Sequence, residues 1–401
     1  MSLNILQINT TDQKGGAAKV AYRLKNGLKK LGHETSMFVG RKYTNDENIF
    51  ILNDLKSFGQ RVRKKLAYYL ANDIDLFNSD KIIKTEVFKK ADIIHCHNLH
   101  SYYFNLNTLK KISKLKPIVW TFHDMWPITP HCAHSFDGPL KNGFWQCPSL
   151  EIFPPLKWHN EKYLEKIKRG IYSQSIFQIA VPSRWLKNKV EESLLGSKEI
   201  NLIYNGIDTE IFKPYPKEET RKKLNLPLDK KIVLSVVKKG QSNPWKGGNY
   251  IGEAISALKN QKEVIFICIG GDFADQRVIN VPFIDDERLL ALYYSASDLL
   301  LHPSIAETFG LTIAEGMACG LPIVSFITGS IPELVDHGSN GLLAAYKNSA
   351  DLISKLSLAL NSPSGRLKEM SLNAQNKVKN NFTLDIMVNN YLQLYNKILR
   401  R

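Results

Sequence analysis

Short apolar runs alternate with helix-like segments through the first half of the chain. The runs are residues 3–8, 93–94, 118–121 and 177–181. After the first run, Val20, Leu24 and Leu28 recur at helical spacing, behind a turn that contains Gly15 and Gly16. Strands that alternate with helices are typical of a parallel sheet with helices on both faces. We therefore predict a doubly wound α/β domain at the start of the chain.

The same alternation starts again in the second half. The new apolar runs are residues 231–237, 264–269, 299–302 and 323–326. A glycine and two prolines between residues 205 and 216 suit an irregular crossover between domains. We therefore expect two Rossmann-like domains, at 1–205 and 206–383, with the amphipathic segment 384–401 packing back on the first as a helix.

The composition is that of a soluble globular protein. Hydrophobic residues make up 43% and charged residues 23% of the 401 positions, which argues against disorder or a fibrous class. No apolar run approaches the roughly 18 residues that cross a bilayer, and the first residues lack the basic region of a secretory signal. We therefore expect a cytoplasmic protein.

The cysteines and histidines give no recognised disulfide or metal signature. The five cysteines are odd in number and lack CxxC spacing, so we expect reduced thiols. Two His/Cys clusters also lack a known zinc-ligand spacing, and no metal is predicted. The first cluster is His95, Cys96, His97 and His100; the second is His131, Cys132, His134 and Cys147.

The formal net charge of +16 indicates an anionic partner: nucleic acid, an anionic lipid surface or a phosphorylated substrate. The densest basic patch lies between Lys56 and Tyr69. Its basic and aromatic side chains are mixed as in a helix that lies on an anionic membrane. A solvated helix face is the alternative. The members are Arg61, Arg63, Lys64 and Lys65, with Phe58, Tyr68 and Tyr69.

Polar residues after the predicted strand 299–302 are candidates for a binding site, because ligands collect at the carboxyl ends of parallel strands. A helix that opens at Gly310 would aim free N–H groups at a diphosphate. Glu315, within that helix, suits ribose hydroxyls, and Glu307, on the loop before it, suits a sugar ring. Both glutamates being merely solvated is the alternative.

This block resembles a known family. Glu307 and Glu315 are spaced as in the E-x7-E block of glycosyltransferase family 4, and the following segment 317–322 fits too. Further matching segments are 15–16, 205–208, 328–333 and 337–341, so the resemblance spans nearly the whole chain. It implies a GT-B fold with two Rossmann-like domains facing a cleft, a nucleoside-diphosphate-sugar donor, retention at the anomeric carbon and no metal.

The resemblance also implies roles for residues of the second domain. Glu315 would bind the ribose and Glu307 the donor sugar, while Phe283 would lie beside the base. Lys246 matches the Lys-Gly site that neutralises the leaving diphosphate, and Lys238 stands where the family usually has an arginine, giving a point charge rather than a fork. The backbone that would contact the sugar and phosphates is that of Phe309, Gly310, Leu311 and Thr312.

In the first domain, His123 and Asp124 resemble the family's His-Asp segment, whose histidine lies near the donor sugar. Gly15 and Gly16 would allow the backbone to approach the donor phosphate or the acceptor closely. His97, at a strand end, is expected on the acceptor side, with Asp124. Relatives with the His-Asp segment often carry further cysteines in the next loop, where this chain keeps only Cys132 and Cys147.

The sequence-based hypothesis is transfer of a hexose from a UDP-hexose such as UDP-glucose to a saccharide or polyprenyl-linked saccharide, in exopolysaccharide or cell-envelope synthesis. GDP-sugars are the alternative donors. The patch between Lys56 and Tyr69 would then hold the protein on the inner face of the cell membrane.

Three competing interpretations remain. Asp73 and Asp75 form a DxD triplet, the metal-binding signature of another glycosyltransferase architecture, although they follow a basic helix rather than a nucleotide-domain strand. A nucleic-acid-binding protein would suit the charge, but no recognised module is present. A protein that binds a sugar nucleotide without catalysis is the third interpretation, but it would not need the full set of Glu307, Glu315, Lys246 and His123.

Overall fold

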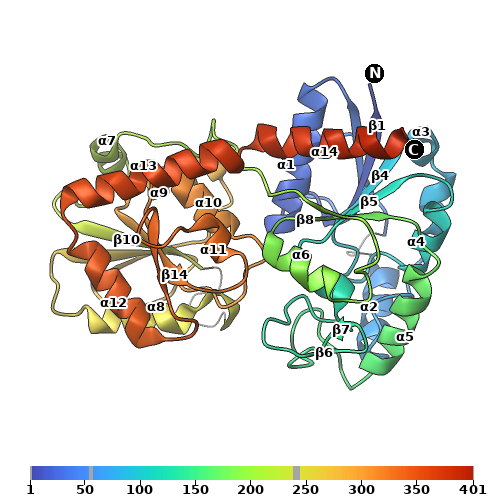
Figure 1. Cartoon of the computed structure of the whole chain (residues 1–401), viewed down its shortest axis with the longest axis horizontal. Coiled ribbons are helices and arrows are strands. Elements are labelled where there is room, and N and C mark those ends of the chain that lie inside the picture. The colour runs from blue at the N-terminus through green and yellow to red at the C-terminus, as the bar shows by residue number, and fades with distance from the viewer. Residues whose placement is uncertain (1, 54–56, 238–243, 401) are drawn as a thin grey trace. The chain divides into compact units, whose positions relative to one another are not determined.

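The computed structural model describes residues 2–53, 57–237 and 244–400 (Figure 1). The chain divides into two compact units. Unit 1 comprises Met1–Gly206 and Leu384–Arg401, and unit 2 comprises Ile207–Thr383. In the described part of the chain, no helix is both long enough and apolar enough to cross a bilayer.

Unit 1 is built on a seven-stranded parallel sheet in the order β3-β2-β1-β4-β5-β8-β9. The chain order reverses between β1 and β4, which is the switch point where doubly wound sheets bind ligands. Both faces are covered, so β4 and β5 are buried at every position. The strands are β1 Asn4–Thr11, β2 Glu34–Arg41, β3 Ile49–Ile51, β4 Ile93–Cys96, β5 Ile118–Thr121, β8 Gln178–Val181 and β9 Ile200–Leu202.

Helices and one small hairpin complete unit 1. The hairpin pairs β6 Leu140–Lys141 with β7 Phe144–Trp145. The 3-10 helices are η1 Asp80–Lys84 and η2 Trp126–Ile128. The α-helices are α1 Gly16–Lys30, α2 Phe58–Tyr69, α3 Glu86–Lys90, α4 Asn107–Ile112, α5 Glu161–Tyr172, α6 Arg184–Glu191 and α14 Leu384–Leu399.

Unit 2 has a six-stranded parallel sheet in the order β12-β11-β10-β13-β14-β15, with its switch point between β10 and β13. Its strands are β10 Lys231–Val236, β11 Val264–Ile269, β12 Val278–Val281, β13 Leu299–His302, β14 Ile323–Phe326 and β15 Gly341–Ala344. The helices are α7 Lys217–Lys223, η4 Pro244–Lys246, α8 Gly248–Ala257, α9 Glu287–Ala296, α10 Leu311–Ala318, α11 Ile331–Leu334, α12 Ser349–Leu360 and α13 Ser364–Asn381. The predicted architecture of two doubly wound α/β halves is confirmed.

The last helix, α14, packs against α1 in unit 1 (Figure 1). A Cβ atom at Gly27 of α1 would collide with the side chain of Val388, which is itself buried. Glycine thus allows the two helices to approach closely. The amphipathic pattern of α14 places Tyr391 and Tyr395 in the core of unit 1.

We predict that Gly27→Ala lowers the melting temperature, whereas Gly170→Ala in α5 raises it. Both glycines lie inside helices, where alanine gains up to about 1 kcal/mol of intrinsic helix propensity. At Gly170 nothing lies within 4 Å of the added methyl group, but at Gly27 the stiff, β-branched Val388 must move. Thermal unfolding measures both; equal stabilisation by the two changes would contradict the close contact between α1 and α14.

Candidate functional site

The strand-end cluster of unit 2 lies between β13 and α10. Gly310 precedes α10 with a φ of 92°, a left-handed conformation that glycine adopts without strain. Because Gly310 has no side chain to cap the helix, the first N–H groups of α10 point out of it with the positive end of the helix dipole. This geometry suits an anion such as a phosphate.

The Glu307 carboxylate is the centre of this cluster. Glu307 is 8% exposed. Its Oε1 atom accepts a hydrogen bond from His302 Nε2 at 2.9 Å and forms a close ion pair with the ammonium group of Lys246. Burial alone would raise the pKa of Glu307, but the charge of Lys246 and the hydrogen bond from His302 outweigh it and hold the pKa well below its ordinary value. Glu307 is therefore a permanent carboxylate.

Lys246 is held in place through the backbone around it. The carbonyl of Trp245 accepts hydrogen bonds from Ser304 Oγ and from the N–H of Ile305, both at 2.9 Å. Gly247 has a φ of 69°, and a Cβ atom there would collide with the carbonyl of Pro303. The backbone at Gly247, directly after η4, is thus in close contact with the loop after β13. The Lys246 side chain remains 36% exposed.

The structure places the other predicted residues of unit 2 around the same sheet edge. Glu315 is buried within α10. The Phe309 ring is buried and packs edge-on against Phe382, so only its backbone is suited to a ligand. Phe283 follows β12 and is 41% exposed. Lys238 lies outside the described residues.

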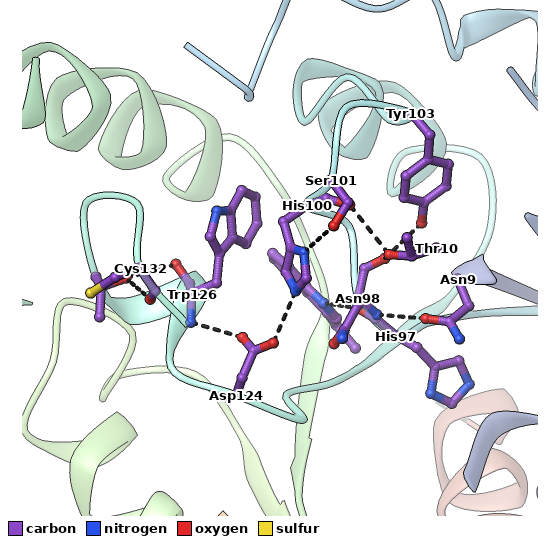
Figure 2. A network of polar contacts seen from close by, with 12 residues as sticks. Asn9, Thr10, His97, Asn98, His100, Ser101, Tyr103, Asp124, Trp126 and Cys132 are labelled. Carbon is purple, nitrogen blue, oxygen red and sulfur yellow. Dashed lines mark hydrogen bonds and ion pairs between the residues drawn. The ribbon is translucent and has the colours of Figure 1, made fainter. Parts of the chain in front are cut away.

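In unit 1, Asp124 and His100 form a buried pair (Figure 2). Asp124 Oδ2 accepts from His100 Nε2 at 2.9 Å, and Oδ1 accepts from the N–H of Trp126 at 2.9 Å. Burial would raise the pKa of Asp124, but His100 reverses this and lowers it. Asp124 thus anchors the turn after β5 rather than facing a ligand alone.

His97 and His123 contact each other, with Nδ1 of His97 2.9 Å from Nε2 of His123. Figure 2 shows the His97 ring turned away from the pair of His100 and Asp124. Gly15 has a φ of 105° and precedes α1, which begins at Gly16; a Cβ atom at Gly15 would meet nothing within 4 Å. Unit 1 therefore brings its predicted residues to the carboxyl edge of its own sheet.

The expectation of five reduced cysteines is wrong for two of them. Cys132 and Cys147 form a disulfide, while Cys96, Cys268 and Cys319 are free and buried. The loop that follows η2 folds back through the hairpin of β6 and β7, and brings the two Cα atoms to 5.9 Å. Sequence spacing alone could not reveal this fold-back. Among the described residues, no three His, Cys, Asp or Glu side chains are grouped to hold a metal ion.

The DxD triplet does not form a pair of exposed ligands. Asp73 is buried, and burial raises its pKa although Lys168 opposes the shift. Asp75 instead accepts a hydrogen bond from Asn72 at 2.7 Å. The two carboxylates are thus part of the packing of unit 1.

Sequence reasoning did not find the roles of two histidines in these clusters, His302 beside Glu307 and His100 beside Asp124. His302 is the last residue of an otherwise apolar strand, and a polar residue at that place was a usable signal. His100 lies in an irregular segment after β4, and no local pattern linked it to Asp124, which is 24 residues away.

Two family models match the chain. Residues 216–377 match the model for glycosyl transferases group 1, and residues 14–211 match the model for glycosyltransferase family 4. The matches together extend over both units. The chain belongs to this family of glycosyltransferases, as the E-x7-E block predicted.

Individual relatives agree with this membership. The chain is 27% identical over 345 residues to an Escherichia coli K12 protein named as a colanic acid biosynthesis glycosyl transferase, WcaC, covering 80% of this chain and 83% of that one. Sucrose-phosphate synthase from Thermosynechococcus elongatus matches at a TM-score of 0.73 and 18% identity over 99% of both chains. HepE from Anabaena, in complex with UDP and glucose, matches at 0.67 and 17% over 99% of both. The predicted GT-B fold class is confirmed.

We predict that Glu307→Gln lowers stability by about 2 kcal/mol at neutral pH, because Lys246 and His302 lose their charged acceptor. The folded-state pKa of Glu307 is lowered from its ordinary 4.5, so this stabilisation is fully present above pH 4.5 and is lost as the pH falls below it. Thermal unfolding from pH 7 to pH 3 should show the two proteins converging in acid.

Glu218→Gln is the control, because Glu218 forms an exposed ion pair with Lys222 on α7. Its effect on stability should be small throughout. A Glu307→Gln difference that does not shrink in acid would contradict a permanently ionised Glu307.

Proposed function

We propose that this glycosyltransferase transfers a hexose from a UDP-hexose, with UDP-glucose the best candidate, to a saccharide or polyprenyl-linked saccharide, with retention and without a metal ion. One observation carries the proposal: a buried carboxylate, Glu307, is paired with the accessible cation Lys246 beside the open N-terminus of α10. Family membership supports the reaction class.

The charges of the cluster match the parts of a nucleotide sugar. A leaving diphosphate gains negative charge as the glycosidic bond breaks, and Lys246 and the N-terminus of α10 offer the positive potential that stabilises it. Lys238 is proposed to add a second cation. Glu307 is ionised and so can only accept hydrogen bonds, which suits the hydroxyl groups of a sugar. Glu315 is proposed to accept from the ribose.

The proposed mechanism needs no protein nucleophile. The acceptor hydroxyl attacks the anomeric carbon from the face that the diphosphate leaves, and this geometry retains the anomeric configuration. The acceptor oxygen bonds to the anomeric carbon as the bond from that carbon to the diphosphate oxygen breaks. A departing phosphate oxygen takes the hydroxyl proton, while His123 is proposed to contact the donor sugar.

Two relatives support the choice of donor and pathway. A solved structure of HepE is titled as a complex with UDP-glucose. WcaC is named for colanic acid biosynthesis, a polysaccharide pathway. We propose the same nucleotide class for this chain and an acceptor from polysaccharide or cell-envelope synthesis.

We further propose that α2 holds the protein at an anionic membrane surface on the cytoplasmic side. Among its residues only Ala67 is buried, while Phe58, Val62 and Leu66 form an exposed apolar stripe at helical spacing. Arg61 and its basic neighbours flank this stripe. An apolar face with basic edges suits the boundary between headgroups and acyl chains.

The surface extends beyond α2. The Trp158 side chain is 48% exposed and donates a hydrogen bond from Nε1 to the carbonyl of Tyr69 at 3.0 Å. Tyr69 is itself exposed. Aromatic side chains with a polar tip favour the membrane interface, so Trp158 extends the proposed contact beyond α2.

For the donor site we predict that UDP-glucose raises the melting temperature more than GDP- or ADP-glucose, because a ligand that binds only the folded state stabilises it.

Lys246→Ala and Glu307→Ala should each lower kcat at least about a hundredfold. Lys222→Ala, on the exposed surface of α7, is the control and should leave kcat unchanged.

Transfer of glucose in excess EDTA tests the metal-free mechanism. Full activity is expected, because Lys246 supplies the positive charge. Loss of activity that added Mn²⁺ or Mg²⁺ restores would favour the metal-dependent alternative, and near-normal turnover of Lys246→Ala would overturn the assignment of the site.

For the membrane surface we predict that Arg61→Glu with Lys65→Glu reduces co-sedimentation with vesicles that contain phosphatidylserine by at least about tenfold, since each basic residue near the surface contributes about 1 kcal/mol. Lys368→Glu with Lys379→Glu in α13 makes the same change of net charge on an exposed face of unit 2 and should have little effect. Equal losses in both variants would show a general charge effect instead.

A further inference from the structure

Three buried imidazole rings form a column on one face of the sheet of unit 1. His95 lies in β4, His97 directly follows that strand, and His123 follows β5. The ring centroids of His95 and His97 are 4.1 Å apart, and those of His97 and His123 are 5.2 Å apart. His97, in the middle, is 1% exposed.

The first ring of the column is fixed at both of its nitrogen atoms. His95 Nδ1 lies 2.6 Å from the hydroxyl of Tyr395, and His95 Nε2 lies 2.7 Å from Thr121 Oγ1. The Thr121 hydroxyl is in turn 2.9 Å from the hydroxyl of Tyr391. Both tyrosines belong to α14. Because both of its ring nitrogens are bonded, the His95 ring is held in a fixed position, and the His97 ring packs against it.

The backbone of His97 is also fixed. Its N–H donates to the carbonyl of Ile8 at 2.9 Å, and its carbonyl accepts from Trp120 Nε1 at 2.7 Å. With the His95 ring on one side, the His97 ring has little freedom to turn. Its Nδ1 atom is thereby held 2.9 Å from Nε2 of His123.

Both rings of this hydrogen bond are neutral at pH 7. Burial lowers the pKa of His97 well below its ordinary value, and the neighbouring His95 and His123 add to the effect. Burial also lowers the pKa of His123, to about 4; Asp124 opposes this shift and His100 reinforces it. One proton therefore lies between Nδ1 of His97 and Nε2 of His123.

The surroundings of His97 determine which of the two rings carries that proton and donates the hydrogen bond. Its Nε2 atom is enclosed and has no hydrogen-bond partner among the described residues. If His123 donated the shared proton, His97 would carry its own proton on Nε2 as an unpaired buried N–H. If His97 donates, only a lone pair stays unpaired, and orphaned buried acceptors are tolerated better than orphaned N–H groups.

We propose that His97 is a positioning residue: its Nδ1–H group donates to His123 and holds His123 in the tautomer that carries its proton on Nδ1. His123 then serves glycosyl transfer as a hydrogen-bond donor from Nδ1, and its Nε2 atom is not available as a base. This role rests on the proposed function, which puts His123 near the donor sugar. It differs from the acceptor-side role predicted for His97, whose side chain has almost no exposed surface.

The direct test is long-range ¹⁵N–¹H NMR of histidine-labelled full-length protein at pH 7, without substrate. The His123 signals are assigned by their loss in His123→Gln. We expect a protonated Nδ1 and an unprotonated Nε2 in the wild-type protein. A wild-type His123 with its proton on Nε2 would overturn the proposal, and this measurement needs no variant of His97.

Two variants of His97 sharpen the test. In His97→Asn the amide nitrogen can take the place of Nδ1, so the tautomer should persist. In His97→Leu no donor remains, and the ratio of Nδ1–H to Nε2–H in His123 should fall about tenfold. An unchanged ratio in a folded His97→Leu protein would count against the role.

Kinetics separate this role from simple packing. We expect kcat for glucose transfer to fall about tenfold in His97→Leu and less than about twofold in His97→Asn, with the KM of UDP-glucose unchanged in both. Equal losses of kcat in the two variants would indicate a packing role only. Absence of transfer by the wild-type protein would contradict the proposed function, whereas the NMR result would stand.

Discussion

The buried carboxylate of Glu307 is the constraint on which the site of unit 2 depends. Removing an ionised carboxylate from water costs several kcal/mol unless charged partners compensate for it. Here Lys246 and His302 do so, and they come from the segment after β10 and from the end of β13. The backbone carbonyl of Glu307 also accepts from the N–H of Ser330, in the loop after β14, at 3.2 Å. One residue therefore ties together the loops of three neighbouring strands.

The switch points of the two sheets carry different electrostatics. At the β10 and β13 edge, an ion pair and a helix N-terminus provide fixed charge and a dipole. At the β1 and β4 edge, burial keeps His97 and His123 neutral, so these two rings offer hydrogen bonds without carrying a charge. In the proposed reaction negative charge develops on a leaving diphosphate, and the ion pair and helix N-terminus of unit 2 suit that charge.

Local pattern was sufficient for most of the fold but not for the contacts of the site. The strands β5, β11, β13 and β14 have the bounds that the apolar runs indicated, because burial on both faces gives continuous apolar sequences. The helix α14, Leu384–Leu399, lies within the segment 384–401 that was predicted as a helix from its amphipathic pattern. The edge strands β3 and β15 were not predicted, because their apolar runs of three and four residues are too short to identify a strand by themselves. The E-x7-E spacing identified Glu307 and Glu315, whereas the contacts of Glu307 with Lys246 and His302 depend on loop geometry.

The disulfide and the histidine column show the same limit. Cys132 and Cys147 meet because a loop folds back on itself, and cysteine spacing does not encode that path. In the sequence His95 stood out only as part of a metal-like cluster, and His97 only as a member of that cluster and as a strand-end residue on the acceptor side. The hydroxyl partner of His95 is Tyr395 in α14, 300 positions further along the chain, and Tyr391 of the same helix bonds Thr121. Only tertiary packing brings these residues together.

Helix α14 supplies hydrogen-bond partners for two buried polar side chains of unit 1. Thr121 and His95 are polar groups in a buried layer, and without partners each would favour a looser packing that admits water. The hydroxyl groups of Tyr391 and Tyr395 satisfy them while their rings fill the space above the sheet. The rigidity of His95 limits the motion of His97 and so keeps its ring beside His123. Helix α14 thereby holds the two rings in contact, while the enclosed Nε2 atom of His97 sets the direction of the hydrogen bond between them.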